Sequence, residues 1–411
     1  MIIRPYQAEK DFANVRRIWE EIAWIDSDEH DHARALESFL GLSSNLVAEL
    51  NGEAECLVSA CEGSICHLEH TLPMQIIAAV TTSLVARKHK LASRTTAQAI
   101  AEGAEAGMPI SVLGMFEQGY YTRLGFGNGP YEKTARFNPA LLNIDAALPV
   151  PVRLNEKDFK DMHHAMMNRW RSHGSVQVMP AGHLHAELLW TEKPVGLGFR
   201  NDDGELTHFI WGSNKDENGP FKISTMAYQN RQQLLELLAL IKSLGNQLYV
   251  VQLTETQHIQ IQDLLLEPFR SFNKTQGSKF QEEIKAEAWW QLRINDLKRC
   301  LASTRLPGRN ELSFNLTVEE PITRFLDKKR SWQGIGGDYT IRLGEECEAT
   351  DGHSAGLPLL KASTNGISRL WLGAASANRL ATGGEIDGEQ SLLDALDQTL
   401  SLPHPHPGWE F

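Results

Sequence analysis

Membrane-spanning segments, targeting signals and disulfides are all missing from this sequence of 411 residues. No apolar run reaches the roughly 18 residues that a membrane span needs, and the opening Met1–Tyr6 acquires charge too early for a signal peptide. The five cysteines are too few, and odd in number, for a disulfide framework in a chain of this length. We therefore expect a soluble, cytoplasmic protein that does not act at a membrane.

Low-complexity tracts, short repeats and an excess of basic residues are also absent. With 42% hydrophobic and 22% charged residues, the composition is globular and excludes a disordered or fibrous chain. Acidic residues outnumber basic ones by 52 to 40, which gives a net charge of −12. A net anion repels phosphate backbones, so nucleic acid is not an expected partner, whereas cationic amines are attracted.

Motifs for common catalytic and metal centres are lacking too. Neither a phosphate-binding G-x-x-x-x-G-K-[ST] loop nor a G-x-S-x-G nucleophile elbow is present. The histidines of His30–His32 and His404–His406 have no further ligands at a fixed spacing, so we expect them on the surface. A cysteine and histidine cluster lacks the tight C-x2-C pair of a zinc site, and we interpret it as buried strand residues and expect no metal: Cys56, Cys61, Cys66, His67 and His70.

The order of expected elements indicates helices and strands that alternate in the first part of the chain. A helix is expected after the first strand, where Phe12, Val15, Trp19 and Ile22 have helical spacing, and another at residues 95–106. Strands are expected where apolar and β-branched runs are bounded by turn residues, at 1–5, 45–50, 55–60, 65–69, 76–86 and 110–116. This order predicts an α/β fold with a mixed sheet.

Two further parts follow a proline-bounded junction at residues 147–152. The second part contains a helix with Met162 and Met166 on one face, which we interpret as core residues. Its other expected elements are strands at 187–190, 206–211 and 247–253 and an apolar helix at 232–244. The third part begins near Ala288 with short strands. We predict domains at residues 1–149, 150–287 and 288–411.

The stretch Gly119–Gly127 is the most informative in the sequence. It follows the expected strand at 110–116 and places Tyr121 four residues before a Gly-Phe turn. A positioned phenol can supply the proton that a leaving thiolate takes up, since the pKa of a thiol is about 8.5. The pattern resembles the end of the acyl-CoA-dependent N-acetyltransferase fold, where such a tyrosine stands beside the thioester sulfur. The residues alone leave open a tyrosine packed in a turn, and leave open whether Tyr120 takes this place.

A basic loop precedes this motif, between an expected strand and the next helix. Lys88, Lys90 and Arg94 supply cations there, and in the acetyltransferase superfamily such a loop and helix N-terminus bind the CoA pyrophosphate. Two positions depart from the superfamily pattern, with Ser93 where glycine is usual and Arg87 where proline is common. Glycine lets a phosphate approach the backbone closely. Ser93 therefore leaves open a solvated loop, or a binding or scaffold protein that keeps the fold without catalysis.

Six segments spread along the chain carry a family resemblance: Thr71–Met74, the basic loop with its flanks at Ser83–Thr96, Phe116–Tyr121, Arg369–Gly373, Ser376–Ala381 and Trp409–Phe411. They resemble the enhanced intracellular survival (aminoglycoside-type) N-acetyltransferases. The resemblance implies an α/β (α+β) architecture of tandem acyl-CoA N-acyltransferase (GNAT) folds with mixed sheets, the second degenerate, followed by a sterol-carrier-like α+β domain. It also implies a homo-oligomer, a hexamer, with acetyl-CoA as co-substrate and no metal.

The same resemblance implies a reaction and the residues for it. A primary amine of an aminoglycoside, a polyamine or lysine attacks acetyl-CoA directly, with Tyr121 as general acid and the C-terminal carboxylate of Phe411 as general base. Residues 83–85 are expected to form a strand that pairs with the pantetheine amides. The cofactor contacts implied by motif are Ser83, Leu84, Val85, Leu91, Ala92, Ser93, Arg94, Thr95, Thr96, Phe116 and Glu117.

The acceptor pocket is expected to have acidic and aromatic residues at its lip. Trp24, Asp26 and Glu410 match that lip by position, and such residues suit a cationic acceptor. The alternative for the acidic stretch from Asp26 through Asp28 and Glu29 is a solvated loop. For Phe411 the alternative is a frayed terminus, the usual fate of chain ends.

Overall fold

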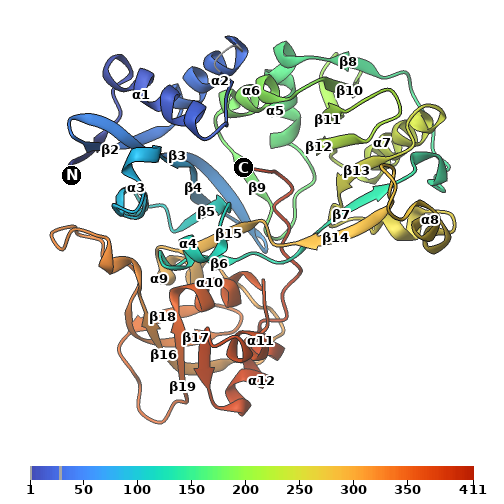
Figure 1. Cartoon of the computed structure of the whole chain (residues 1–411). Coiled ribbons are helices and arrows are strands. Elements are labelled where there is room, and N and C mark those ends of the chain that lie inside the picture. The colour runs from blue at the N-terminus through green and yellow to red at the C-terminus, as the bar shows by residue number, and fades with distance from the viewer. Residues whose placement is uncertain (1, 27–29) are drawn as a thin grey trace.

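Three mixed β-sheets organise the chain in the computed structural model, which describes residues 2–26 and 30–411. Figure 1 shows the sheets of the N-terminal part (blue) and of the middle part (green and yellow) side by side, with the third sheet (orange and red) below them. The predicted α/β class with mixed sheets is confirmed.

The first sheet has eight strands and takes segments from all three predicted parts. In spatial order they are β1 (Ile2–Pro5), β2 (Ser44–Leu50), β3 (Glu53–His67), β4 (His70–Thr82), β5 (Ile110–Gly114), β15 (Trp290–Ile294) and β6 (Gly127–Asn128), with β9 (Val176–Val178) paired to β3. Its helices are α1 (Ala8–Glu21), α2 (His30–Gly41), α3 (Leu91–Glu105) and α4 (Gln118–Thr122). Helix α1 buries Val15, Ile18 and Trp19, whose spacing gives it one apolar face.

The second sheet has seven strands and the third has five. The second runs β14 (Glu283–Glu287), β7 (Glu132–Phe137), β13 (Val251–Thr254), β12 (Phe221–Ala227), β11 (Leu206–Asn214), β10 (Pro194–Arg200) and β8 (Val152–Leu154), with helices α5 (Phe159–Met167), α6 (Ala181–Trp190), α7 (Arg231–Ser243) and α8 (Pro268–Thr275). The third runs β18 (Glu348–Asp351), β17 (Gly337–Leu343), β16 (Leu312–Glu319), β19 (Leu359–Ser363) and β20 (Ile386–Gly388), with helices α9 (Leu297–Ala302), α10 (Thr364–Leu372), α11 (Ala377–Thr382) and α12 (Gln390–Thr399).

The first and second sheets each contain one pair of parallel neighbouring strands, and in both sheets this pair is hydrogen-bonded over a short stretch only. Strands β4 and β5 are paired at only two positions, Gln75 with Ser111 and Ile76 with Val112. Strands β12 and β13 are likewise paired at only two positions, with Lys222 opposite Gln252 at the end of the ladder. Beyond these pairs the neighbouring strands are not joined by ladder hydrogen bonds.

Three strands cross the predicted domain boundaries. Strand β7 pairs with β13 and β14 of the second sheet, β9 pairs with β3, and β15 lies between β5 and β6. The division at residues 149 and 287 therefore stays a prediction about folding units. The sheets themselves are built by exchange of strands between the parts.

A buried ion pair fastens the first sheet to the third part. Arg293 of β15 is fully buried, and its Nη2 lies 2.9 Å from Oε2 of Glu320, whose side chain is 3% exposed. Arg293 also donates to the carbonyl of Leu124, just before the Gly-Phe turn. Each of these two buried charges is stabilised by the other and by the hydrogen bonds around them.

Three secondary-structure predictions are wrong. Residues 55–60 and 65–69, expected as two strands, belong to the single strand β3, which ends at His67. Residues 187–190, expected as a strand, end helix α6, whose inner face buries Leu184 and Leu188. The strand expected at 76–86 ends at Thr82, and Leu84–Ala86 form a 3-10 turn. Among the described residues, the structure has no helix that is both long and apolar enough to cross a bilayer.

Candidate active site

Helix α3 begins between Lys90 and Leu91, and cations flank its N-terminus. The side chain of its N-cap residue, Lys90, makes no capping hydrogen bond, and Lys90 has a left-handed backbone with φ of 61°. Lys88 and Arg94 are exposed beside it. The positive end of a helix dipole, amides without a side-chain cap and nearby cations together suit a pyrophosphate. The residues therefore fit the phosphate end of acetyl-CoA.

The predicted pairing of residues 83–85 with pantetheine needs correction, because this segment is not a strand. The amide of Ser83 donates to the Glu55 carbonyl at 3.0 Å, and the amide of Leu84 donates to Glu21 Oε2 at 2.9 Å. These bonds turn the chain away from β4. The side chains of Leu84 and Val85 are exposed, and their contact with the cofactor stays a prediction.

Ser93, which departs from the superfamily pattern, links helix α3 to the tyrosine motif. Its hydroxyl donates to the Tyr120 hydroxyl at 3.3 Å. The other predicted contacts of this helix lie in its first two turns, where Leu91, Thr95 and Thr96 are buried. Ser93 therefore joins α3 to α4, a connection that glycine cannot make.

Tyr121 lies on α4, directly after β5, and its ring is buried in the core. It packs edge-on against Tyr120 and Phe126, at centroid distances of 4.9 and 6.2 Å. Burial, with smaller contributions from Tyr120 and Glu117, raises the pKa of Tyr121. Its phenol is thus protonated at neutral pH, as a general acid has to be. The Glu117 side chain accepts the Gly119 amide at 3.0 Å and so begins the helix.

Phe116 is one of the most exposed apolar side chains in the described chain. Its exposed fraction is 91%, at the point where β5 has ended and α4 has not begun. Its predicted place near the pantetheine end stays a prediction. Any contact that removes this apolar ring from water would be favourable in free energy.

The C-terminal segment returns to the first sheet and ends beside β5. Figure 1 shows this segment (dark red) leaving the third part and finishing near β9, between the first and second sheets. The ring of Phe411 packs against Trp289 and Trp290, with centroids 5.3 and 6.4 Å apart. A Cβ placed on Gly114 would lie 2.5 Å from the main-chain oxygen of Phe411. The absence of a side chain at Gly114 therefore makes room for the terminal group.

A cavity of about 610 Å³ is lined by the tail and by the neighbouring strands β12 and β13 of the second sheet. Helices α5 and α6 form another wall through Met166, Leu184 and Glu187. The tail covers it with residues that include Glu410 and Phe411. The end of the tail thus faces β5 of the first sheet and the cavity of the second.

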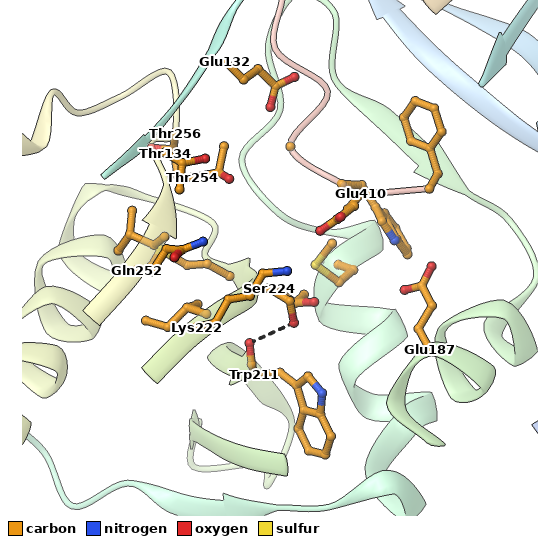
Figure 2. Close-up of a pocket in the computed structure, with 18 of the residues that line it drawn as sticks. Glu132, Thr134, Glu187, Trp211, Lys222, Ser224, Gln252, Thr254, Thr256 and Glu410 are labelled. Carbon is orange, nitrogen blue, oxygen red and sulfur yellow. Dashed lines mark hydrogen bonds between the residues drawn. The ribbon is translucent and has the colours of Figure 1, made fainter. Parts of the chain in front are cut away.

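Four carboxylates line this cavity, from Glu132 on β7, Glu187 on α6, Glu287 on β14 and Glu410 on the tail. Figure 2 shows Glu187 and Glu410 across the cavity from Gln252 of the second sheet. Burial raises the pKa of Glu132 to about 7 and, together with the charge of Glu410, that of Glu187 to about 8. Within the described part of the chain, Oε1 of Glu132 has no hydrogen-bond partner. The side chains of Glu132 and Glu187 are therefore partly protonated at neutral pH, and in their ionised form they would bind a cation.

The structure brings only one of the three predicted acceptor residues to this cavity. Glu410 lines it, but Trp24 and Asp26 are not among its lining residues. Trp24 is 46% exposed and meets Trp19 edge-on at 5.1 Å, and the amide of Asp26 donates to His32 Nδ1 at 3.1 Å. Asp28 and Glu29 lie outside the described residues.

No sequence pattern identified Glu132, Glu187 or the tryptophan pair Trp289–Trp290 as residues of the candidate site. The only signal that pointed to any of them was two adjacent tryptophans at a predicted domain boundary. His406, expected on the surface, is instead a largely buried residue of the tail, and its Nε2 donates to the Glu255 carbonyl at 2.7 Å. Burial accordingly lowers the pKa of His406 to about 4.

Candidate metal ligands do not assemble in the part of the chain that the structure describes, where no group of three His, Cys, Asp or Glu side chains could hold an ion. All five cysteines are free thiols, and Cys56 and Cys61 are buried on β3.

Comparison with known proteins gives a consistent set of relatives. Residues 3–129 match the family profile described as an acetyltransferase (GNAT) domain. An uncharacterized N-acetyltransferase of Streptomyces avermitilis is 23% identical over 362 residues, which are 81% of this chain and 80% of that protein.

Two solved structures extend the likeness over the whole chain. A probable N-acyltransferase of unknown function from Enterococcus faecalis has a TM-score of 0.78 at 16% identity, over 98% of this chain and 97% of its own. Eis1 from Mycobacterium abscessus has a TM-score of 0.76 at 13% identity, over 100% of both chains. These findings confirm the predicted resemblance and its tandem GNAT architecture as a fold. The sterol-carrier-like character of the third part stays a prediction.

Proposed function

Because the chain is an acetyl-transferring enzyme with a GNAT domain at residues 3–129, we propose that it transfers the acetyl group of acetyl-CoA to a primary amine of a cationic acceptor. In this reaction the amine nitrogen attacks the thioester carbonyl carbon and the C–S bond breaks. Tyr121 gives its phenolic proton to the departing thiolate, and the carboxylate of Phe411 accepts a proton from the amine, directly or through water. No acyl-enzyme forms.

The observation that carries this proposal is the position of Phe411 at Gly114. Strand β5 ends there, and α4 with Tyr121 follows four residues later. The proposed acid and base thus come from segments far apart in the sequence, and each of these segments adjoins the end of strand β5.

The acidic cavity supports a cationic acceptor. Glu187 and Glu410 both line it, so a second positive charge on the acceptor would find a partner while the first amine reacts. An aminoglycoside, a polyamine or a lysine side chain meets this requirement. Glu187, with a pKa raised to about 8, also suits a group that takes up protons near neutral pH.

The remaining features of the proposal concern compartment and assembly. We place the reaction in the cytoplasm, because all five cysteines are free and acetyl transfer needs no oxidising environment. Assembly into a hexamer remains part of the proposal, and analytical ultracentrifugation of the purified chain tests it.

A thiol-release assay with a panel of polyamines, aminoglycosides and lysine peptides tests the reaction. Tyr121→Phe and a chain shortened by Phe411 should each lose roughly 10²-fold or more in kcat, the usual range for a lost acid or base. Calorimetry should show unchanged acetyl-CoA binding in both variants. Unchanged turnover in the shortened chain would overturn the role of the tail. Failure of the parent protein to bind millimolar acetyl-CoA would instead favour the scaffold alternative.

A further inference from the structure

The loop between α5 and β9, residues 168–175, forms a seat for the C-terminal tail. Arg169 in this loop is buried, with an exposed fraction of 7%. Its guanidinium donates to three main-chain carbonyls, at 2.9 Å to Met166, 2.5 Å to Val176 and 3.0 Å to Pro407. Among the described residues no carboxylate forms an ion pair with Arg169.

Main-chain hydrogen bonds hold the tail against the same loop. The amide of Val176 donates to the Pro407 carbonyl at 2.9 Å, and the amide of His406 donates to the His173 carbonyl at 3.1 Å. The Ser175 hydroxyl donates to the His406 carbonyl at 3.3 Å. Residues 406 and 407 are therefore fixed in register by two elements of the second part.

The fit of this seat is too close for a side chain at Gly174. Gly174 has φ of +81°, and a Cβ there would lie 2.6 Å from the His406 amide nitrogen. The backbone conformation and the contact both favour glycine. The tail thus rests directly on the backbone of the loop.

Arg169 also reaches the residue that precedes the reactive end of the tail. Its guanidinium carbon lies 5.4 Å from the centre of the Trp409 ring. The Trp409 and His163 rings also pack edge-on, with their centroids 5.8 Å apart. Trp409 is 6% exposed. Beyond it the tail has only Glu410 and Phe411, so an error of one residue in register would move the terminus by about 3.4 Å.

We propose that Arg169 is a positioning residue, which fastens Pro407 and Trp409 and thereby sets the place of the Phe411 carboxylate at Gly114. This inference rests on the proposed function, in which that carboxylate is the base. A planar guanidinium with five donors can serve three carbonyls at once, whereas the single ammonium of lysine cannot hold the same geometry. The second acetyltransferase-like part, which lacks the tyrosine motif, then serves the first by holding its base in place.

Arg169→Met, Arg169→Lys and Gly174→Ala test the assignment, the last without removing any charge. Arg200→Met is the matched control, because Arg200 lies in the same part but pairs with Asp158 and Asp161. Two measurements are made on each full-length chain. Release of Phe411 by carboxypeptidase A, followed by mass spectrometry, reports how firmly the tail is held. Steady-state kinetics give kcat and the KM for acetyl-CoA.

Arg169→Met and Gly174→Ala should each release Phe411 at least ~10-fold faster and lose at least ~10-fold in kcat, because a displacement of about 1 Å costs up to 10²-fold. The KM for acetyl-CoA should stay within about twofold, since the phosphate-binding helix is untouched. Arg169→Lys should fall between Arg169→Met and the parent. Arg200→Met should match the parent in both measurements.

The outcomes separate this inference from the proposed function. If Arg169→Met and Gly174→Ala release Phe411 no faster than the parent does, the claim that the loop at 168–175 holds the tail is refuted. If they release it faster but keep the parent kcat while the chain without Phe411 is inactive, the positioning role is wrong and the proposed function stands. If the chain without Phe411 keeps full kcat, the proposed function fails, and the release rates still decide whether Arg169 holds the tail. Should Arg169→Met fold poorly, Arg169→Lys and Gly174→Ala decide alone.

Discussion

Replacement of Gly114 by alanine tests the proposed base with the smallest possible change. The added Cβ would lie 2.5 Å from the main-chain oxygen of Phe411, whereas a carbon and an oxygen in contact are usually about 3.3 Å or more apart. The terminal group therefore has to withdraw by about 0.8 Å. Since a misplacement of about 1 Å costs a reaction up to 10²-fold, we expect kcat to fall by about 10- to 100-fold. This corresponds to about 1.4–2.7 kcal/mol of lost transition-state stabilisation.

The assay is thiol release under saturating acetyl-CoA, with Gly41→Ala as the matched control because a Cβ on Gly41 meets nothing within 4 Å. The decisive variant combines Gly114→Ala with removal of Phe411. If the alanine acts only by displacing the carboxylate, the combined variant should be as slow as the shortened chain alone. The reasoning is refuted if Gly114→Ala keeps the parent kcat, or if it slows the shortened chain further. A rise confined to the KM for acetyl-CoA would also refute it, since Gly114 would then act on the cofactor.

Three further predictions follow from the buried charged and polar groups. Because burial raises the pKa of Tyr121, the alkaline limb of the kcat–pH profile should lie above pH ~10, and a limb near pH 8 would argue against Tyr121 as the acid. Burial raises the pKa of Glu187 to about 8 in the folded protein, above its pKa in the unfolded chain. The folded state therefore binds this proton more tightly, and the free energy of unfolding falls as the pH rises from the unfolded-chain pKa through 8. Urea unfolding should show Glu187→Gln gaining about 2 kcal/mol on the parent between pH 6 and 8.5, and a gain independent of pH would contradict this. Glu320→Ala leaves the charge of Arg293 buried and should lower the free energy of unfolding by about 3–5 kcal/mol, whereas Glu319→Ala, at an exposed position, should change it by less than about 0.5 kcal/mol.

Local sequence was enough to predict the elements around the tyrosine. The run at 110–116, the motif after it and the Gly-Phe turn became β5, α4 and β6 because each depends on neighbours in the chain. The helix after the basic loop was predicted for the same reason, although it begins at Leu91 and thus four residues early.

What the sequence could not supply were pairings between distant segments. Trp290 lies opposite Gly114 in the first sheet, and no local pattern connects two residues so far apart. The short apolar run at 187–190 fits a strand and a helix equally well, and packing of Leu184 and Leu188 decided for the helix. His406 is polar and proline-flanked, which predicts a surface position, but the tail is buried because the loop with Arg169 binds its backbone. The acidic cavity combines residues from α5, α6, strands β7 and β11 to β14 and the tail, and such a combination has no signature in the sequence.

The place of β15 between β5 and β6 has a consequence for how the protein is made. A ribosome synthesises the residues of β1 to β6 early, but the edge of β5 stays unpaired until residues 290–294 have emerged. While the whole second part is translated, the edge of β5 in the nascent N-terminal part therefore stays exposed and can pair with strands of other chains. We expect cellular chaperones to cover that edge, and truncations before residue 290 to aggregate instead of folding as an independent first domain.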